Sequence, residues 1–345
     1  MIDLRSDTIT IPSHAMLETI PDAALGDSGR WNGERRGEDP TVNALEDLAC
    51  ELLGKEAAAF CTSGTMGNTC AVLTHCGPGD VVLVDERQHL YRTEKGAFSP
   101  KLGQLKAVVY GADAHGDPDP KDIERLMAEH DVKLLCVENS NNNRGGQVMP
   151  LERMKELHDI AGAHGVPVHL DGARIFNAAH ALGVEAKEIA RYADSCMFCV
   201  SKGLGAPIGS LVCGSRAFIY ELRQTRRLLG GDLRQGGVAA APAIYALRHN
   251  IPILKEDNRR AEELAEAIQG LGVISCSAQV DTNIVMLHVP AGRAEELQQR
   301  LLAHGVVAGA VDEARVRLVF HLGISEEDTA KTIQILKTVD CEMAQ

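Results

Sequence analysis

Short apolar segments rich in β-branched residues alternate with helical patterns along most of the chain. Segments of this kind occupy residues 80–85, 106–111, 132–139, 166–171, 195–201 and 209–214. Helix candidates lie between several of them, such as 151–165, which ends on a glycine. Apolar strands joined by helices form mostly parallel sheets that are covered by helices on both faces. The alternation therefore predicts an α/β fold with a doubly wound, mostly parallel sheet.

The pattern changes near residue 250. Its main segments there are one long charged helix and two apolar strands, at 254–272, 282–289 and 315–320. With a helix between the strands and another at the end, this order predicts a smaller α+β domain that closes over the first. We expect a large domain over 1–249, which includes the N-terminal segment 1–25, and a small C-terminal domain over 250–345.

Charge and composition exclude several classes of function. The net charge of −13 disfavours binding to nucleic acids or to anionic membranes. No apolar segment reaches the roughly 20 residues that cross a bilayer, and the polar N-terminus is unlike a signal peptide. Ten scattered cysteines then favour a reducing, cytoplasmic location. Cys196 and Cys199 lie on a predicted strand without a second pair, so we interpret them as structural and assign no metal.

Polar residues follow three predicted strands, at the edge of the sheet where ligands gather. In the first case, Ser63, Gly64 and Thr65 lie between a strand and a helix, in AAFCTSGTMGN. Backbone N–H groups at a helix start, together with a hydroxyl, form a cradle for a phosphate. Alternatively, Ser63 is only the N-cap of that helix.

The second case is Asp171, at the end of a strand, with Arg174 in the turn after it. A buried carboxylate needs a cationic or hydrogen-bonding partner. We therefore expect Asp171 either to form a salt bridge with Arg174 or to face a bound ligand.

The third case is Lys202, which stands in front of three glycines and a proline in SKGLGAPIG. It is either a surface cation or a functional amine. The glycine spacing fits neither a P-loop nor a dinucleotide-binding motif. A lysine, an aspartate and a phosphate cradle at neighbouring strand ends share one explanation, the cofactor pyridoxal 5′-phosphate. The lysine forms a Schiff base with it, the aspartate keeps the pyridine nitrogen protonated, and the cradle holds the phosphate.

These residues belong to a series of motifs that resembles the low-specificity L-threonine aldolases of the β-eliminating lyase family. The motifs are DLRSDT (3–8), GEDPTVN (37–43), GKEAA (54–58), SGTM (63–66), HLDGARIFNAA (169–179), SKGLGAP (201–207) and RLV-H (317–321). They cover most of the chain and occur in order. The resemblance implies a pyridoxal-phosphate enzyme of fold type I, with a large domain and a smaller C-terminal domain.

The resemblance also implies roles for individual residues. Lys202 matches the Schiff-base lysine and Asp171 the partner of the pyridine nitrogen. The other residues matched to the cofactor are Gly64, Thr65 and Ser201 near the phosphate, His89 stacked on the ring, and Arg234, which supports the phosphate from a neighbouring subunit. The residues matched to the substrate carboxylate are Ser6, Arg174 and Arg317.

His89 is also the candidate general base, because retro-aldol cleavage requires removal of the β-hydroxyl proton. Alternatively, His89 is an ordinary loop residue and a water molecule is the base. Glu94 is a candidate neighbour of His89.

The chain departs from the family pattern in three places. Segment 26–40 is longer than usual and contains Trp31 and three arginines, one of which, Arg36, stands where the family has a tyrosine. It is either a determinant of substrate preference or a solvated loop. Asn141 replaces a histidine of the family motif. Asp232 stands two residues before Arg234, where we expect it to weaken the contact of that arginine with phosphate.

The resemblance implies retro-aldol cleavage of threonine, allo-threonine or a related β-hydroxy-α-amino acid to glycine and an aldehyde. One alternative is a β-eliminating lyase that releases ammonia and a keto acid and does not need a base at the β-hydroxyl. A more distant alternative is a non-catalytic small-molecule-binding protein on the same fold. The family assignment further implies a homodimer or homotetramer whose active sites lie at the subunit interface.

Overall fold

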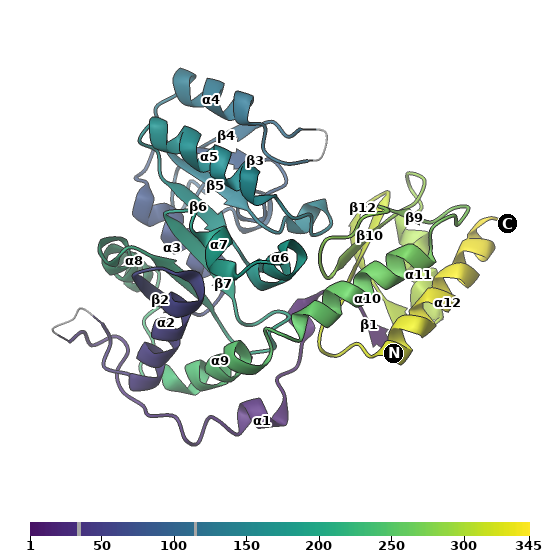
Figure 1. The fold of residues 1–345 in the computed structure, drawn as a ribbon, viewed down its shortest axis with the longest axis horizontal. Coiled ribbons are helices and arrows are strands. Elements are labelled where there is room, and N and C mark those ends of the chain that lie inside the picture. The colour runs from purple at the N-terminus through teal and green to yellow at the C-terminus, as the bar shows by residue number, and fades with distance from the viewer. Residues whose placement is uncertain (33–35, 114–115) are drawn as a thin grey trace.

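A seven-stranded sheet forms the centre of the larger part of the molecule (Figure 1). We describe a computed structural model that covers residues 1–32, 36–113 and 116–345. In sheet order the strands are β2 (Ala57–Cys61), β8 (Ser210–Gly214), β7 (Ser195–Cys199), β6 (Val168–Asp171), β5 (Val132–Glu138), β3 (Val81–Asp85) and β4 (Lys106–Tyr110). Of these seven strands, β8 runs in the direction opposite to the other six, so that its pairings with β2 and β7 are antiparallel. The predicted mostly parallel sheet is therefore confirmed.

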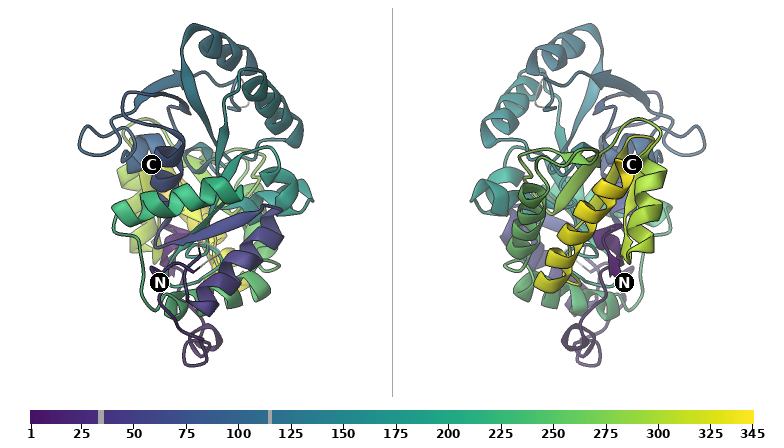
Figure 2. Two further views of the ribbon diagram at one scale, coloured as in Figure 1. Left: turned by 90° about the vertical axis from the view of Figure 1, so that its left-hand side faces the viewer. Right: turned by 90° about the vertical axis from the view of Figure 1, so that its right-hand side faces the viewer.

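Helices cover both faces of this sheet (Figures 1 and 2). On one face lie α2 (Pro40–Leu53), α4 (Pro120–Glu129), α5 (Leu151–Ala163), α6 (Ile175–Leu182) and α7 (Ala186–Ala190), and on the other α3 (Gly64–His75) and α8 (Arg216–Leu228). Alternate residues of β5 belong to the two apolar layers, with Leu135 in one and Leu134 in the other. Apolar side chains cover both faces of the sheet, which explains why the strands are continuous apolar segments in the sequence.

Two further helices lie along the lower edge of the larger part in Figure 1. They are α1 (His14–Leu17) and α9 (Gly237–His249), which contact each other, and α9 also packs on α2. Of the helices in the described ranges, none is both long and apolar enough to traverse a bilayer.

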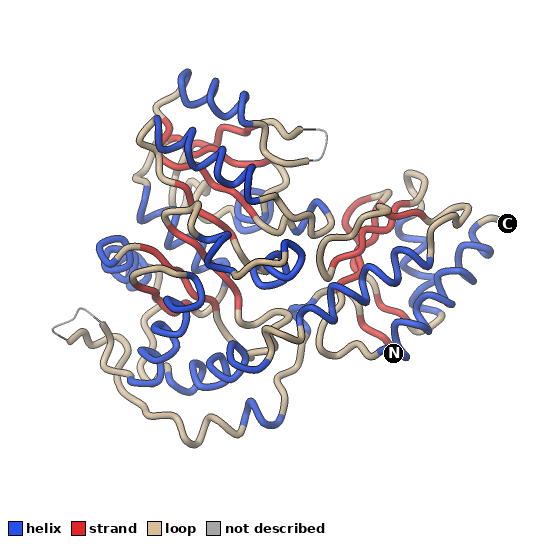
Figure 3. The backbone as a smooth tube through the Cα atoms, viewed as in Figure 1, coloured by secondary structure: helices blue, strands red, loops and turns tan. Residues whose placement is uncertain are grey.

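The smaller part contains an antiparallel sheet with helices on its outer face (Figures 2 and 3). In sheet order its strands are β12 (Gly309–Asp312), β13 (Arg315–Val319), β10 (Ile284–His288) and β9 (Ser275–Cys276). The helices are α10 (Leu254–Ala267), α11 (Ala294–Ala303) and α12 (Glu326–Met343). The predicted elements are present, although the helix expected over 254–272 ends at Ala267. The chain therefore has the α+β C-terminal part that its pattern predicts.

The N-terminus lies in this smaller part, although the sequence suggested that it accompanies the larger one. Strand β1 (Ile2–Asp3) pairs in parallel with β11 (Val306–Val307), and Leu4 is fully buried in the apolar core of the smaller part. Both chain ends therefore belong to the smaller part, near opposite ends of α12 in Figure 1. The division at residues 249 and 250 stays a prediction.

The carboxyl ends of the parallel strands bring several acidic residues to one edge of the large sheet. Asp85, Glu138 and Asp171 are the last residues of β3, β5 and β6, and Glu138 is in register with Asp171. The smaller part contributes Arg317 from β13 to the same region, where it contacts Asn142 after β5. The two parts of the molecule therefore meet at the edge that binds ligands in sheets of this kind.

The position of Leu4 gives a test of how the N-terminus is anchored. Leu4→Ala should lower the free energy of unfolding by roughly 2–5 kcal/mol, because it leaves a cavity in the smaller core. Leu302→Ala is the matched control, because that leucine is 50% exposed and its loss should change stability by less than about 0.5 kcal/mol. Urea denaturation of both variants measures the difference. Equal losses would contradict the anchored N-terminus.

Candidate active site

Asp171 is the most central acid of the site. Only 2% of it is exposed, and its Oδ1 accepts a hydrogen bond from the backbone N–H of Ala173 at 3.1 Å. Its Oδ2 accepts from the side-chain amide of Asn68 on α3 at 2.8 Å. The alternative that Asp171 forms a salt bridge with Arg174 is wrong, because that arginine has a different partner.

The partner of Arg174 is Asp7, in the N-terminal segment. The guanidinium Nε and Nη2 donate to the two carboxylate oxygens at 2.6 and 2.7 Å, and both side chains are almost completely buried. Burial alone would raise the pKa of Asp7, but Arg174 holds it down to about 2. This bidentate pair positions the guanidinium rigidly beside the end of β6.

Two arginines converge on the side chain of Asn142. Its Oδ1 accepts from Arg174 Nη1 at 3.1 Å and from Arg317 Nη1 at 2.8 Å. Burial and the neighbouring Arg174 lower the pKa of Arg317. Ser6 precedes Asp7 in the segment that contacts both arginines, because Arg317 Nη2 also donates to the Arg5 carbonyl. The structure therefore brings together Arg174 and Arg317, two of the three residues matched to a carboxylate, and places the segment that contains Ser6 beside them.

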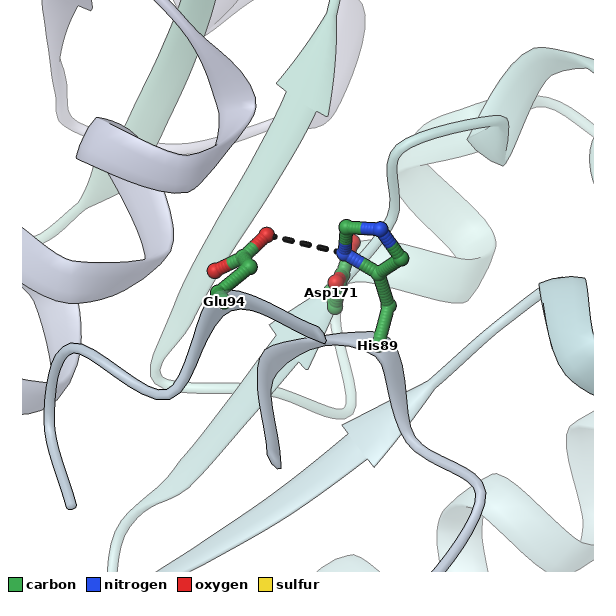
Figure 4. Close-up of side chains that lie close together, drawn as sticks. All are labelled: His89, Glu94 and Asp171. Atoms are coloured by element: carbon green, nitrogen blue, oxygen red, sulfur yellow. Dashed lines mark hydrogen bonds and ion pairs between the residues drawn. The ribbon is translucent and has the colours of Figure 1, made fainter. Parts of the chain in front are cut away.

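His89 and Glu94 form a second pair next to Asp171 (Figure 4). One turn of π-helix, Leu90–Glu94, places these residues on the same side, and His89 Nδ1 lies 3.0 Å from Glu94 Oε1. The hydrogen bond to Glu94 is the main cause that raises the pKa of His89. Nitrogen and oxygen atoms of His89, Glu94 and Asp171 all lie within 4.8 Å of one another.

Glu138 stabilises the two loops that carry these residues. Its carboxylate accepts the backbone N–H of His89 at 2.7 Å and that of Asn142 at 2.9 Å. Burial and the nearby charge of Asp171 raise the pKa of Glu138 to about 7, against the effect of the two N–H donors. We did not identify Glu138, Asp7, Asn68 or Asn142 from the sequence. The position of Glu138 at a strand end was a signal that could have found it.

Lys202 follows β7 and is half-buried. Among the described residues, none forms a hydrogen bond or an ion pair with its amine. The start of α3 lies close by, because a Cβ on Gly64 would come within 2.8 Å of Cys199 Sγ at the end of β7. Only glycine permits this close approach.

Ser63 is the N-cap of α3, as the simpler interpretation of this turn predicts. Its hydroxyl accepts the N–H of Met66 at 3.1 Å. Gly64 and Thr65 form the first turn of the helix, where backbone N–H groups have no partner within the helix and can bind an anion. A free amine, a buried carboxylate and a helix N-terminus within one site fit pyridoxal phosphate.

Ser201 and Arg234 are at the margin of this group. Ser201 Oγ donates to the Gly209 carbonyl at 3.2 Å. Arg234 is 71% exposed and forms an ion pair with Asp27 at 3.2 Å. Asp232 pairs with two other arginines of the same region, Arg227 at 2.6 Å and Arg226 at 3.3 Å. Its expected effect on the phosphate contact of Arg234 stays a prediction.

The unusual segment 26–40 packs on α8. Trp31 lies under the Arg227 guanidinium at 4.5 Å from the ring centre and against Tyr220, and Arg36 pairs with Asp47. The third arginine of the segment falls within residues 33–35, outside the described ranges. The described portion is therefore a packed loop on its own chain.

Two other sequence interpretations concern Asn141 and the pair of cysteines on β7. Asn141, at the place of a family histidine, donates to Asp85 at 3.2 Å and caps a 3₁₀ turn. Cys196 and Cys199 are buried, free thiols on β7. All three side chains are packed within the fold.

Comparison with known proteins identifies the family. The family described as beta-eliminating lyase matches residues 3–291. The low specificity L-threonine aldolase of Escherichia coli (strain K12) is 40% identical over 96% of this chain and 97% of that protein. Low-specificity L-threonine aldolase 1 of Arabidopsis thaliana is 36% identical over 96% of this chain and 94% of that protein.

A solved structure supports the same assignment at the level of the fold. The structure of Leishmania major threonine aldolase matches with a TM-score of 0.83 over 99% of this chain and 100% of that chain, at 18% identity. This likeness confirms the predicted architecture. The chain therefore belongs to the beta-eliminating lyase family of pyridoxal-phosphate enzymes of fold type I, as its motifs predicted.

Proposed function

We propose that the protein cleaves threonine, allo-threonine or a related β-hydroxy-α-amino acid to glycine and an aldehyde. The observation that carries this proposal is the His89–Glu94 pair beside Asp171 (Figure 4). A base directed at the β-hydroxyl is needed for retro-aldol cleavage but not for β-elimination. The names of the relatives that share 36–40% of their residues with this chain support the same reaction.

The cofactor residues retain the roles that the motifs suggested. Pyridoxal phosphate, when bound, supplies an electron sink for the bond that breaks at Cα. We assign Lys202 to its carbonyl carbon and Asp171 to its pyridine nitrogen. The residues assigned to its phosphate are Gly64, Thr65, Ser201 and, from a neighbouring subunit, Arg234.

The substrate carboxylate binds at Arg174 and Arg317, with Ser6 beside them. Both guanidinium groups already donate to one oxygen of Asn142, and a carboxylate presents two such oxygens. Because Asp7 fixes Arg174, the carboxylate orients the amino acid relative to Asp171. This orientation determines which bond at Cα is presented for cleavage.

His89 accepts the proton of the substrate β-hydroxyl on its Nε2 atom. Its Nδ1 faces Glu94, so that Nδ1 carries the hydrogen and Nε2 is the basic atom of the neutral ring. As the β-carbon leaves as the aldehyde carbon, the electron pair of the broken bond stays with Cα, where a proton completes glycine. Without an ordered base, water must remove the proton, which is the alternative interpretation.

The proposal includes a homo-oligomer, dimer or tetramer, and a cytoplasmic location. The exposure of Arg234, which is 71%, suits a residue that reaches a neighbouring subunit. The ten cysteines are all free thiols, which a reducing compartment maintains. Size-exclusion chromatography with light scattering measures the oligomeric state.

The proposed reaction is tested by visible absorbance and product analysis of the purified protein. We expect a yellow protein that releases glycine and acetaldehyde from L-threonine or L-allo-threonine. The Lys202→Ala variant should lack the visible absorbance band, and its kcat should be at least 10³-fold lower, because no other residue can replace the amine. Ammonia and a keto acid as products would favour β-elimination. A protein that stays colourless after addition of pyridoxal phosphate would contradict both the aldolase reaction and the β-elimination.

The Glu94–His89 pair predicts a change in pH dependence. The hydrogen bond that His89 donates to Glu94 raises the pKa of His89, so that the basic form of His89 is lost already at a higher pH as the solution is acidified. Glu94→Gln removes the charge and lowers this pKa. The acidic limb of the kcat/KM profile should therefore move to lower pH. Glu86→Gln, at an exposed acid of the same loop, is the control and should leave the limb in place.

The assignment of the substrate carboxylate to the two arginines predicts a change in KM. Arg317→Gln should raise KM for threonine about 10–100-fold, because a charge-assisted hydrogen bond to the carboxylate is lost. Arg315→Gln is the matched control two residues earlier on β13, where the guanidinium pairs with Asp312. Steady-state kinetics of both variants measure the effect. The same KM in wild type and Arg317→Gln would contradict the carboxylate site.

A further inference from the structure

Asn68 connects the two acids of the proposed site. It lies on α3 and is 1% exposed. Its amide nitrogen donates to Asp171 Oδ2 at 2.8 Å and to Glu94 Oε1 at 3.2 Å. Carboxylates only accept hydrogen bonds, so both amide hydrogens are used and the amide oxygen faces the other way. One side chain thus holds the candidate partner of the pyridine nitrogen and the candidate orienting group of the base.

A chain of buried polar groups continues behind Asn68. Its Oδ1 lies 3.2 Å from His169 Nε2, and His169 Nδ1 lies 2.9 Å from Ser195 Oγ. Ser195 Oγ in turn lies 2.9 Å from His75 Nε2. These residues come from α3, β6 and β7, and both His169 and Ser195 are fully buried.

The orientation of the Asn68 amide, which donates to two carboxylates, sets the direction of each hydrogen bond in this chain. Asn68 Oδ1 can only accept, so His169 Nε2 must carry a hydrogen. Burial lowers the pKa of His169 to about 3, with a smaller contribution from His75, so the ring is neutral and its Nδ1 accepts from the Ser195 hydroxyl. Ser195 has then used its hydrogen and accepts from His75 Nε2. Burial lowers the pKa of His75 to about 4, so that ring is neutral as well.

We propose that His75, Ser195, His169 and Asn68 form a positioning relay that orients the Asn68 amide toward Asp171 and Glu94. Every donor in the relay points in the same direction, from His75 to Asp171. If the amide turned around, its oxygen would face two acids, and its NH₂ group would face the N–H of His169. The relay therefore gives Asn68 one favourable orientation. The inference rests on the roles proposed for Asp171 and His89.

A purely structural role is the competing explanation, because buried polar groups need partners wherever they lie. Such a role predicts that any loss at His169 only lowers stability. A positioning role predicts that cofactor binding depends first on the Nε2 donor, which contacts Asn68, and less directly on the Nδ1 acceptor. The contacts of Nδ1 with Ser195, and of Ser195 with His75, act by keeping the hydrogen of the imidazole on Nε2, and a side-chain amide does not need this. Two substitutions at His169 separate these requirements.

His169→Gln and His169→Asn form the matched pair. The amide nitrogen of glutamine reaches about as far as imidazole Nε2 and keeps a donor to Asn68. The shorter asparagine reaches only the position of Nδ1 and loses that donor. We expect the asparagine variant to bind pyridoxal phosphate about 10–100-fold more weakly and to shift its visible absorbance, as loss of comparable supporting hydrogen bonds does in metal sites. The glutamine variant should stay within about 3-fold of wild type.

Equal behaviour of the two variants, whether both impaired or both unimpaired, would overturn the relay. Thermal unfolding in parallel reports stability, which we expect to fall in both. Should the asparagine variant not fold, the second measurement still decides.

The second measurement needs neither cofactor nor substrate. In full-length, cofactor-free protein labelled with ¹⁵N-histidine, His169 should show the signals of the neutral Nε2–H form and no change between pH 5 and pH 9. Its signals are assigned by their loss in His169→Gln. The Nδ1–H form, or titration in this range, would overturn the relay. Because this result is independent of catalysis, failure of the relay is distinguished from failure of the proposed reaction, which the product analysis reports.

Discussion

The buried ion pair between Asp7 and Arg174 joins the two parts of the molecule at the site. Asp7 belongs to the segment that leaves the smaller part, and Asn283 of that part also donates to its carboxylate. Arg174 belongs to the turn after β6 in the larger part. Breaking such a pair would leave an unpaired charge away from water, which is strongly unfavourable. The pair therefore holds the smaller part, with Arg317, against the edge of the large sheet.

The same edge collects charged groups because parallel strands end together. Each buried acid there has a specific set of donors: Arg174 for Asp7, two backbone N–H groups for Glu138, and Asn68 for Asp171. These contacts fix the backbone at His89 and the turn after β6, beside the strand β7 that Lys202 follows. A site of this construction can orient a small amino acid with few mobile parts.

The order of strands and helices could be read from the sequence, because a sheet buried on both faces requires continuous apolar runs. The turn at the start of α3, Asp171 and Lys202 could also be selected as candidate site residues, since polar residues at strand ends are conspicuous after such runs. The partner of Arg174 was not found. Asp171 lies three residues away in sequence and Asp7 lies 167 residues away, yet the structure selects the distant acid. Local spacing carries no information about a contact across the chain.

By itself the sequence determined the α/β architecture, the family and the residue types that a pyridoxal-phosphate enzyme requires, because these depend on local apolar patterns and on contiguous motifs. Only the tertiary structure decided that β1 joins the smaller part, that Asn142 lies between two arginines, and that His75, Ser195, His169 and Asn68 are connected. Their hydrogen bonds join groups from separate strands and helices. Such partners become neighbours only when long-range packing closes the core and excludes the water that would otherwise bind them.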